Sequence, residues 1–170
     1  VPLTAPRLAG LAIALAPKSP QAWEAMATVE DLASAPGTSI PYWRRCLELT
    51  GNADFAVGLA AALRMADRLD EGESVARQAV LSLPTGSPGQ YRAAATFAAI
   101  LRARNKPAEA VEAVGFIPAP ARSPGIAVRD ALTLPIVLEG PDEIDRWRDR
   151  LVARLDTLEA GGLRLSDPFR

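Results

Sequence analysis

The sequence predicts an all-α protein: a stack of antiparallel helix hairpins followed by one long helix near the C-terminal end. Three observations predict this class. Aromatic residues make up only 5% of the chain, so the core must be built mainly from Ala, Leu and Val, as is common in helical stacks. Two turns, DRLDEG and NKPAEA, superimpose so that Asp67 matches Asn105, thirty-eight residues later. Small residues also recur at one place in successive predicted helices, at Ala27, Ala60 and Ala98.

The first predicted hairpin follows an apolar segment, LAGLAIALA at 8–16, and a proline-containing break. Ser19 is placed to cap the next helix, and Pro20 falls in its first turn, where a missing N–H costs nothing. The stretch SAPGTSIP at 34–41 lengthens the loop inside this hairpin. The apolar segment is short and follows a single arginine, so we interpret it as a helix end and not as an exported leader.

Two further hairpins follow with the same layout. The unit at 53–84 contains a helix to about Met65, a tight turn, and a second helix that ends before Pro84. The unit at 91–118 repeats this order, with its first helix ending near Arg104. Helix axes lie roughly 8–10 Å apart, and the lower end of that range requires Ala or Gly at the contact. The recurring small residues therefore predict close crossings within each hairpin. An ordinary helical bundle is the alternative.

The pattern changes after residue 118, so we divide the chain into a repeat domain (1–118) and a C-terminal segment (119–170). The stretch PAPARSPG is rich in proline and predicts a rigid connection. A short helix is expected at 127–132, followed by a break at Pro135.

A long helix is predicted at about 142–160, and two glycines stop it. Apolar residues spaced by three and four form one stripe along this helix. The stripe residues are Ile144, Trp147, Leu151, Leu155 and Leu158. We expect the arginines at 146, 148, 150 and 154 to face elsewhere.

Composition excludes several classes of function. The formal net charge is −1 with no long run of one sign, which argues against nucleic-acid binding. Histidine is absent, and with it the commonest metal ligand and general base. The acid pairs Asp70–Glu71 and Asp142–Glu143 lie at helix starts, where the helix dipole explains them. Cys46 fills a small-residue position and forms no internal disulfide, so we expect a cytoplasmic protein. We predict no catalytic residue, cofactor, metal ion or membrane contact within these residues.

The hairpins resemble the tetratricopeptide repeat family over roughly residues 5–118. The matching positions are Trp23, Met26 and Ala27 in the first unit, Ala60, Gly72, Ala79 and Pro84 in the second, and Ala98, Ala110 and Pro118 in the third. This resemblance implies a right-handed superhelical stack. It also implies that the first helix of each hairpin lines a concave groove for a protein or peptide partner.

Carrying that groove over to this chain gives a set of predicted partner-binding residues. They are Gln21, Glu24, Thr28 and Asp31 in the first unit, Asp54, Val57, Ala61, Arg64 and Met65 in the second, and Arg92, Ala95, Ala99 and Arg102 in the third. The groove would be acidic at one end and basic at the other. A solvated polar face is the alternative for Arg64, Arg92 and Arg102.

The C-terminal segment resembles a junction in bacterial SPINDLY-type proteins, relatives of the O-linked N-acetylglucosamine transferases. The matching residues are Leu134, Pro135, Glu143, Ile144, Trp147, Arg148, Arg150, Leu165, Asp167 and Pro168. The resemblance implies the acceptor-binding repeat region of a protein O-glycosyltransferase, with flagellin among the acceptors and the catalytic lobes beyond this sequence. The alternative is a stand-alone scaffold or regulatory protein that dimerises through the stripe from Ile144 to Leu158.

Overall fold

The computed structural model describes residues 4–33, 37–138 and 140–162. Within these residues every regular element is a helix, which confirms the predicted all-α class. The elements are α1 (Ala5–Leu15), α2 (Pro20–Leu32), α3 (Ile40–Thr50), α4 (Ala53–Met65), α5 (Leu69–Ser82), α6 (Pro88–Ala103), α7 (Pro107–Val114), a short 3-10 helix (Ala119–Ala121), α8 (Pro124–Ala131) and α9 (Pro141–Ala160). Residues 34–36 of the predicted long loop, and Leu165, Asp167 and Pro168 of the junction, lie outside the described residues.

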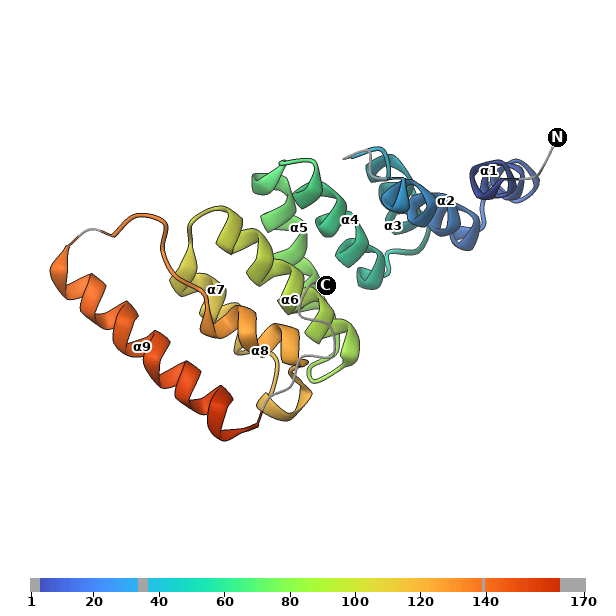
Figure 1. The fold of residues 1–170 in the computed structure, drawn as a ribbon. Coiled ribbons are helices and arrows are strands. Elements are labelled where there is room, and N and C mark those ends of the chain that lie inside the picture. The colour runs from blue at the N-terminus through green and yellow to red at the C-terminus, as the bar shows by residue number, and fades with distance from the viewer. Residues whose placement is uncertain (1–3, 34–36, 139, 163–170) are drawn as a thin grey trace.

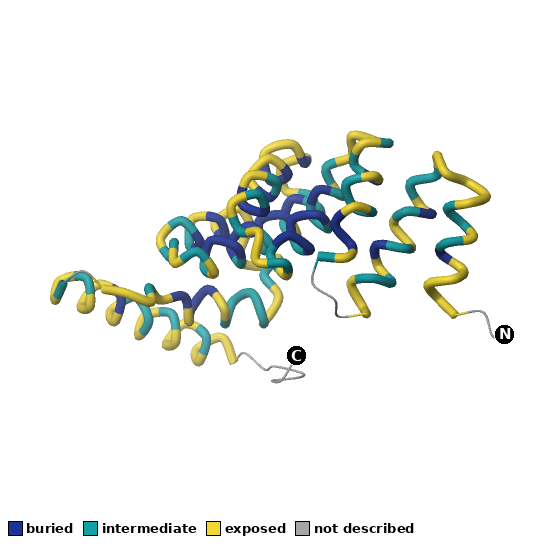
Figure 2. The backbone as a smooth tube through the Cα atoms, turned by 90° about the horizontal axis from the view of Figure 1, so that it is seen from above, coloured by how far each residue is buried: buried dark blue, intermediate teal, exposed yellow. Residues whose placement is uncertain are grey.

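The helices pack one after another in chain order, as Figure 1 shows from α1 at one end to α9 at the other. Among the pairs with substantial contact, only α4 and α6 are not consecutive. The largest core cluster joins α4, α5, α6 and α7. Figure 2 shows that buried residues gather in the middle of the stack and become sparse toward its ends. The core therefore lies mainly in the central helices of the stack, from α4 to α7.

The two turns aligned in the sequence have the same backbone structure. Asp67 and Asn105 both adopt left-handed conformations, with φ of 57° and 54°. In both turns the N–H of the next residue donates to the carbonyl five positions earlier, at 2.9 and 2.8 Å. These are the bonds of a Schellman helix end, and Asp and Asn tolerate the left-handed position better than most residues. The thirty-eight-residue spacing is thus a structural repeat.

The close crossing predicted between α4 and α5 is confirmed. Ala60 has no exposed surface. A Cβ atom added at Gly72 would lie 3.4 Å from both Leu63 Cβ and Ile100 Cδ1. The α5 backbone therefore rests directly on α4, with α6 covering the other side of the same glycine. Ala98, the matching residue of the next pair, is also fully buried.

Two predicted helix starts need correction. Ser19 precedes α2, but its hydroxyl makes no capping bond and instead donates to Gln21 Oε1 at 2.9 Å. The short helix expected at 127–132 begins earlier, at Pro124, because Ser123 Oγ accepts the N–H of Ile126 at 3.3 Å. Part of the predicted connection is therefore the first turn of α8.

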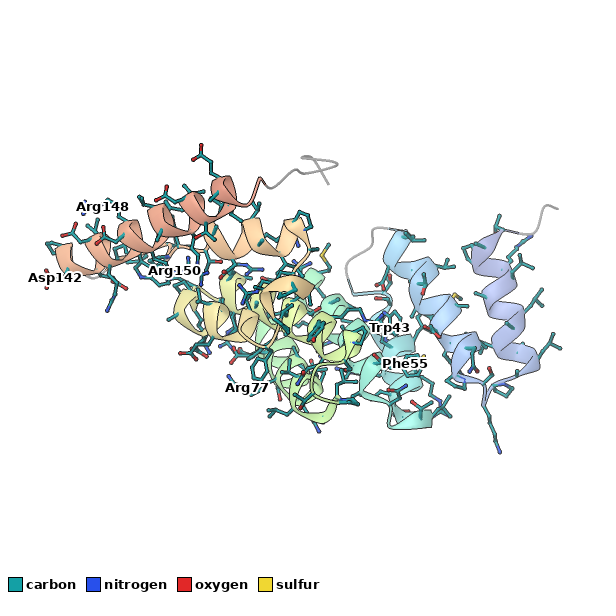
Figure 3. The ribbon with its side chains drawn as sticks, turned by 90° about the horizontal axis from the view of Figure 1, so that it is seen from below. Trp43, Phe55, Arg77, Asp142, Arg148 and Arg150 are labelled. Atoms are coloured by element: carbon teal, nitrogen blue, oxygen red, sulfur yellow. The ribbon has the colours of Figure 1, made fainter. Side chains whose placement is uncertain are left out.

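The prediction that four arginines of α9 face away from the stack is wrong for two of them. Arg150 donates to Asp130 Oδ1 at 2.8 Å, and Arg154 Nε lies 3.8 Å from Asp130 Oδ2. Figure 3 shows Arg150 pointing from α9 toward the stack and Arg148 pointing away from it. Arg150 also lies over the ring of Trp147, which is the one α9 residue classed as buried. A buried carboxylate on α8 attracts these arginines, and helical spacing alone gave no indication of it.

Candidate protein-binding face

The predicted partner-binding residues come from α2, α4 and α6, the first helices of successive pairs. We call the side of the molecule that carries them the first-helix face. All four predicted α2 residues are exposed. Their recorded hydrogen bonds stay near or within α2 or reach α3: Gln21 accepts from Ser19, Thr28 donates to the Glu24 carbonyl, and Asp31 accepts from Trp43. These bonds do not link the α2 residues to the predicted residues of α4 and α6.

The structure brings α4 and α6 together at one end of the first-helix face. Arg92 on α6 donates to Asp54 Oδ1 on α4 at 2.8 Å. These two positions are thirty-eight residues apart, so they are equivalent places in the repeat. Gly89 allows the approach, because a Cβ atom there would lie 2.8 Å from Asp54 Oδ1. The arginine balances the charge of Asp54, so this predicted acidic position has an internal partner.

The other end of the α4–α6 contact carries Arg64 and Arg102, which are also equivalent repeat positions. Both are partly buried, and Arg64 Nη2 lies 3.5 Å from the sulfur of the exposed Met65. A third member, Arg129 on α8, was not predicted from the sequence. Arg102 and Arg129 line one small cavity of about 20 Å³. We call Arg64, Arg102 and Arg129 the arginine row.

The arginine row differs from the other basic residues of α3 to α9. Among the described residues that precede α3, Arg7 and Lys18 also lack an ion pair. Most Lys and Arg side chains between residues 40 and 160 have a carboxylate oxygen within 4.0 Å. They are Arg44, Arg45, Arg68, Arg77, Arg92, Arg104, Lys106, Arg122, Arg146, Arg148, Arg150 and Arg154. Within the described part of the chain, the three arginines of the row have no such partner. Their positive charge is therefore not balanced by a direct ion pair there.

Arg102 is influenced by the charges of both other members of the row. Partial burial lowers the pKa of Arg102, and the charges of Arg129 and Arg64 lower it further. Asp130 acts in the opposite direction. The repulsion fits their placement: Arg102 and Arg129 line one cavity, and Arg64 lies on the helix that packs against α6. An anion placed among them would relieve that repulsion.

A larger cavity, about 570 Å³, lies away from the first-helix face. It lies between α7 and α9. Its lining includes Val111 of α7, Val137 of the connection before α9, and Arg146 and Trp147 of α9. No cluster of acids suited to a metal ion occurs among the described residues. The cavity combines apolar and charged groups without an arrangement that indicates a particular reaction.

The acid pair Asp70–Glu71 and the cysteine have structural roles. Asp70 and Glu71 lie in the first turn of α5, as predicted, and they also bind arginines: Asp70 pairs with Arg104, and Glu71 pairs with Arg44 and Arg68. Cys46 is fully buried, which confirms its interpretation as a small interior side chain.

No helix in the described ranges combines the length and apolar character needed to cross a membrane. Compared with models of known protein families, with curated proteins and with solved structures, the chain matches none.

Proposed function

We propose that this chain is a protein–protein interaction module, a right-handed tetratricopeptide-like stack that binds a polypeptide along its first-helix face. The observation that carries the proposal is the direct packing of α4 on α6. It places Asp54 beside Arg92 and brings the helix of Arg64 against the helix of Arg102, so equivalent positions of two successive units lie side by side. A surface that repeats along a stack suits an extended chain, which also repeats its contacts. The single buried cysteine fits a cytoplasmic module.

The test is an unbiased peptide selection followed by mapping of the binding face. A random peptide library displayed on phage is selected against the folded chain, and bound peptides are titrated into isotope-labelled protein. We expect amide shifts at the predicted residues of α4 and α6, such as Val57 and Arg92. Failure to select any peptide, or shifts confined to α3, α5 and α7, would contradict the proposal.

We further propose that the module selects the acceptor of a protein O-glycosyltransferase. The support is the resemblance of the sequence from Leu134 to Arg150, whose second part forms the first half of α9. No cofactor is assigned to this part of the enzyme, and flagellin is the acceptor that the resemblance implies. Deleting the encoding gene should remove the sugar mass from flagellin in intact-mass spectra. An unchanged flagellin mass in a strain that normally glycosylates it would contradict this assignment.

The second candidate is a stand-alone scaffold that dimerises through α9. One observation favours it: Ile144, Val152 and Leu155 leave 47%, 51% and 44% of their surface exposed on one helix. A second copy could cover them. Sedimentation equilibrium would then show a dimer that Leu155→Glu converts to a monomer, whereas Asp156→Lys on the polar side would leave it intact. A monomer at all concentrations would exclude this candidate.

A further inference from the structure

The arginine row places three positive charges close together: Arg64 and Arg102 lie at equivalent positions of two helices that pack on each other, and Arg102 and Arg129 line one cavity. Arg64, Arg102 and Arg129 come from α4, α6 and α8, and repulsion from the other two arginines acts on Arg102. Among the described basic residues between 40 and 160, only these three lack a carboxylate within ion-pair distance. Because the other basic residues in this range are paired with carboxylates, these three arginines are the ones available to an external anion.

The nearest internal acid is already occupied. Asp130 lies beside Arg129 in the chain, but its side chain is only 4% exposed. Its Oδ1 accepts from Arg150 at 2.8 Å, and its Oδ2 lies 3.6 Å from Arg122. Asp130 therefore holds α8 and α9 together, and its charge acts on Arg102 of the row without a direct ion pair.

We propose that the arginine row binds acidic side chains of the polypeptide partner. This inference rests on the proposed function and names the chemistry of that partner. Neighbouring helices lie about 10 Å apart. An extended chain in the polyproline II conformation advances about 3.1 Å per residue with three residues per turn, so every third side chain lies on the same side of the chain. A carboxylate at every third residue therefore meets successive arginines. Charges spread over three helices fit several carboxylates along a chain better than one compact phosphate group.

The direct test uses synthetic peptides of about twelve residues, long enough to pass all three helices. One fluorescein-labelled peptide carries Glu at every third position, with Ala and Ser between. A matched peptide replaces each Glu with Gln, and fluorescence anisotropy measures both affinities. We expect the Glu peptide to bind at least about tenfold more tightly, and this preference to shrink as salt is raised from about 0.05 to about 0.3 M.

The variants replace the arginines of the row with glutamine. Each of Arg64→Gln, Arg102→Gln and Arg129→Gln should weaken binding of the Glu peptide roughly threefold, and the triple variant about thirtyfold. The matched control changes three paired arginines outside the row, Arg45, Arg68 and Arg148, to glutamine, so that the net charge falls equally. Circular dichroism checks that both triple variants keep their helices.

The outcomes separate this inference from the proposed function. Equal binding of the Glu and Gln peptides, or equal losses in the two triple variants, would overturn the role of the row. If the phage selection still gave peptides that bind α4 and α6 without acidic enrichment, the protein-binding function would stand alone. If no selected peptide bound the first-helix face, the function itself would fail. Thermal melting adds a further check. If Arg102 contributes to ligand binding and not to stability, Arg102→Gln should leave the Tm unchanged or raise it.

Discussion

Glu73 on α5 is a nearly buried carboxylate that connects two helix pairs. It accepts hydrogen bonds from Arg77 on its own helix and from Arg104 and Lys106 at the turn between α6 and α7. Burial is the largest single influence and raises its pKa, but the hydrogen bonds from Lys106 and Arg77 and the positive charges together outweigh it. The pKa of Glu73 therefore lies below its usual value. The carboxylate stays ionised while buried because three cations surround it.

We expect Glu73→Gln to destabilise the protein by about 2–3 kcal/mol, because the cations lose their shared partner in a poorly hydrated site. The lowered pKa also fixes a pH dependence: the unfolded chain binds this proton more readily, so the stabilisation is present above the usual glutamate pKa and is lost as pH falls through the folded value. Urea unfolding at neutral and acidic pH measures both effects. A loss of similar size from Glu48→Gln, a paired but exposed glutamate on α3, would show that burial is irrelevant.

Cys46 on α3 should be unreactive in the folded protein. Its thiol donates to the carbonyl of Pro20 across 3.4 Å, and burial, assisted by the charge of Glu24, raises its pKa to about 11. At pH 8 the thiolate is then about a hundredfold scarcer than in the unfolded chain. Ellman's reagent should label Cys46 slowly in native protein and quickly in guanidinium. The thiol loses its proton at a lower pH in the unfolded chain than in the folded protein. Cys46 therefore also lowers the free energy of unfolding as pH rises from about 9 to about 11. Rapid labelling of native protein would contradict the buried placement.

At the scale of the helix, the contact between α3 and α4 depends on the absence of a side chain at Gly58. A Cβ atom there would lie 2.8 Å from the ring of Trp43. The ring is held in place, because Trp43 Nε1 donates to Asp31 Oδ2 at 3.0 Å and the ring packs at a tilt against Phe55. Figure 3 shows Trp43 and Phe55 close together at this junction. The tryptophan therefore lies directly on the helix backbone.

Gly58→Ala should destabilise the protein by about 1–3 kcal/mol, since the clash outweighs the better helix propensity of alanine. Gly10 in α1 provides the matched control, because a Cβ atom there would meet nothing within 4 Å. Gly10→Ala should instead stabilise α1 by about 0.5–1 kcal/mol. Thermal unfolding of the two variants in parallel measures the difference. The same sign for both would show that Trp43 moves aside at little cost.

The helices and turns were predictable because they depend on local sequence. Asp67 and Asn105 begin matching turns at matching offsets, and each of these residue types tolerates the left-handed backbone that the turn requires. The alanines at the helix crossings were equally predictable from the sequence, because only small residues permit helices to cross closely. The start of α8 was missed, although Ser-Pro-Gly at 123–125 repeats the Ser-Pro-Gly that begins α6 at 87–89.

The remaining features depend on contacts between distant segments. Arg129 belongs to the arginine row because α8 lies beside α6, where Arg129 and Arg102 line one cavity. No residue spacing within α8 indicated this placement. Arg150 resembled a solvent-facing residue because its partner, Asp130, lies twenty residues earlier on another helix. Two members of the arginine row, Arg64 and Arg102, were thus among the predicted binding residues because they follow the repeat, whereas Arg129 lies where the repeat changes into α8 and α9.

At the scale of the whole molecule, the stack is almost one-dimensional, so each helix depends mainly on its neighbours. The end helix α9 has substantial contact only with α8 among the described elements. Arg150 supplies much of that attachment, because it donates both to the Asp130 carboxylate and to the carbonyls of residues 130, 131 and 133. Such an arrangement allows α9 to open while the central helices stay folded.

Asp130→Asn should release α9 without unfolding the rest of the stack. Removing the charge leaves Arg150, Arg122 and Arg154 without their shared carboxylate, and we expect the free energy of opening α9 to fall by about 2–3 kcal/mol. Hydrogen exchange followed by mass spectrometry should show amides of 141–160 exchanging about thirty- to a hundred-and-fiftyfold faster, with those of α4 to α6 unchanged. Asp156→Asn removes the same charge from the exposed side of α9 and should leave both regions unaffected. Uniformly faster exchange in Asp130→Asn would mean that the stack opens as one cooperative unit, and the view of α9 as a separately opening end helix would be wrong.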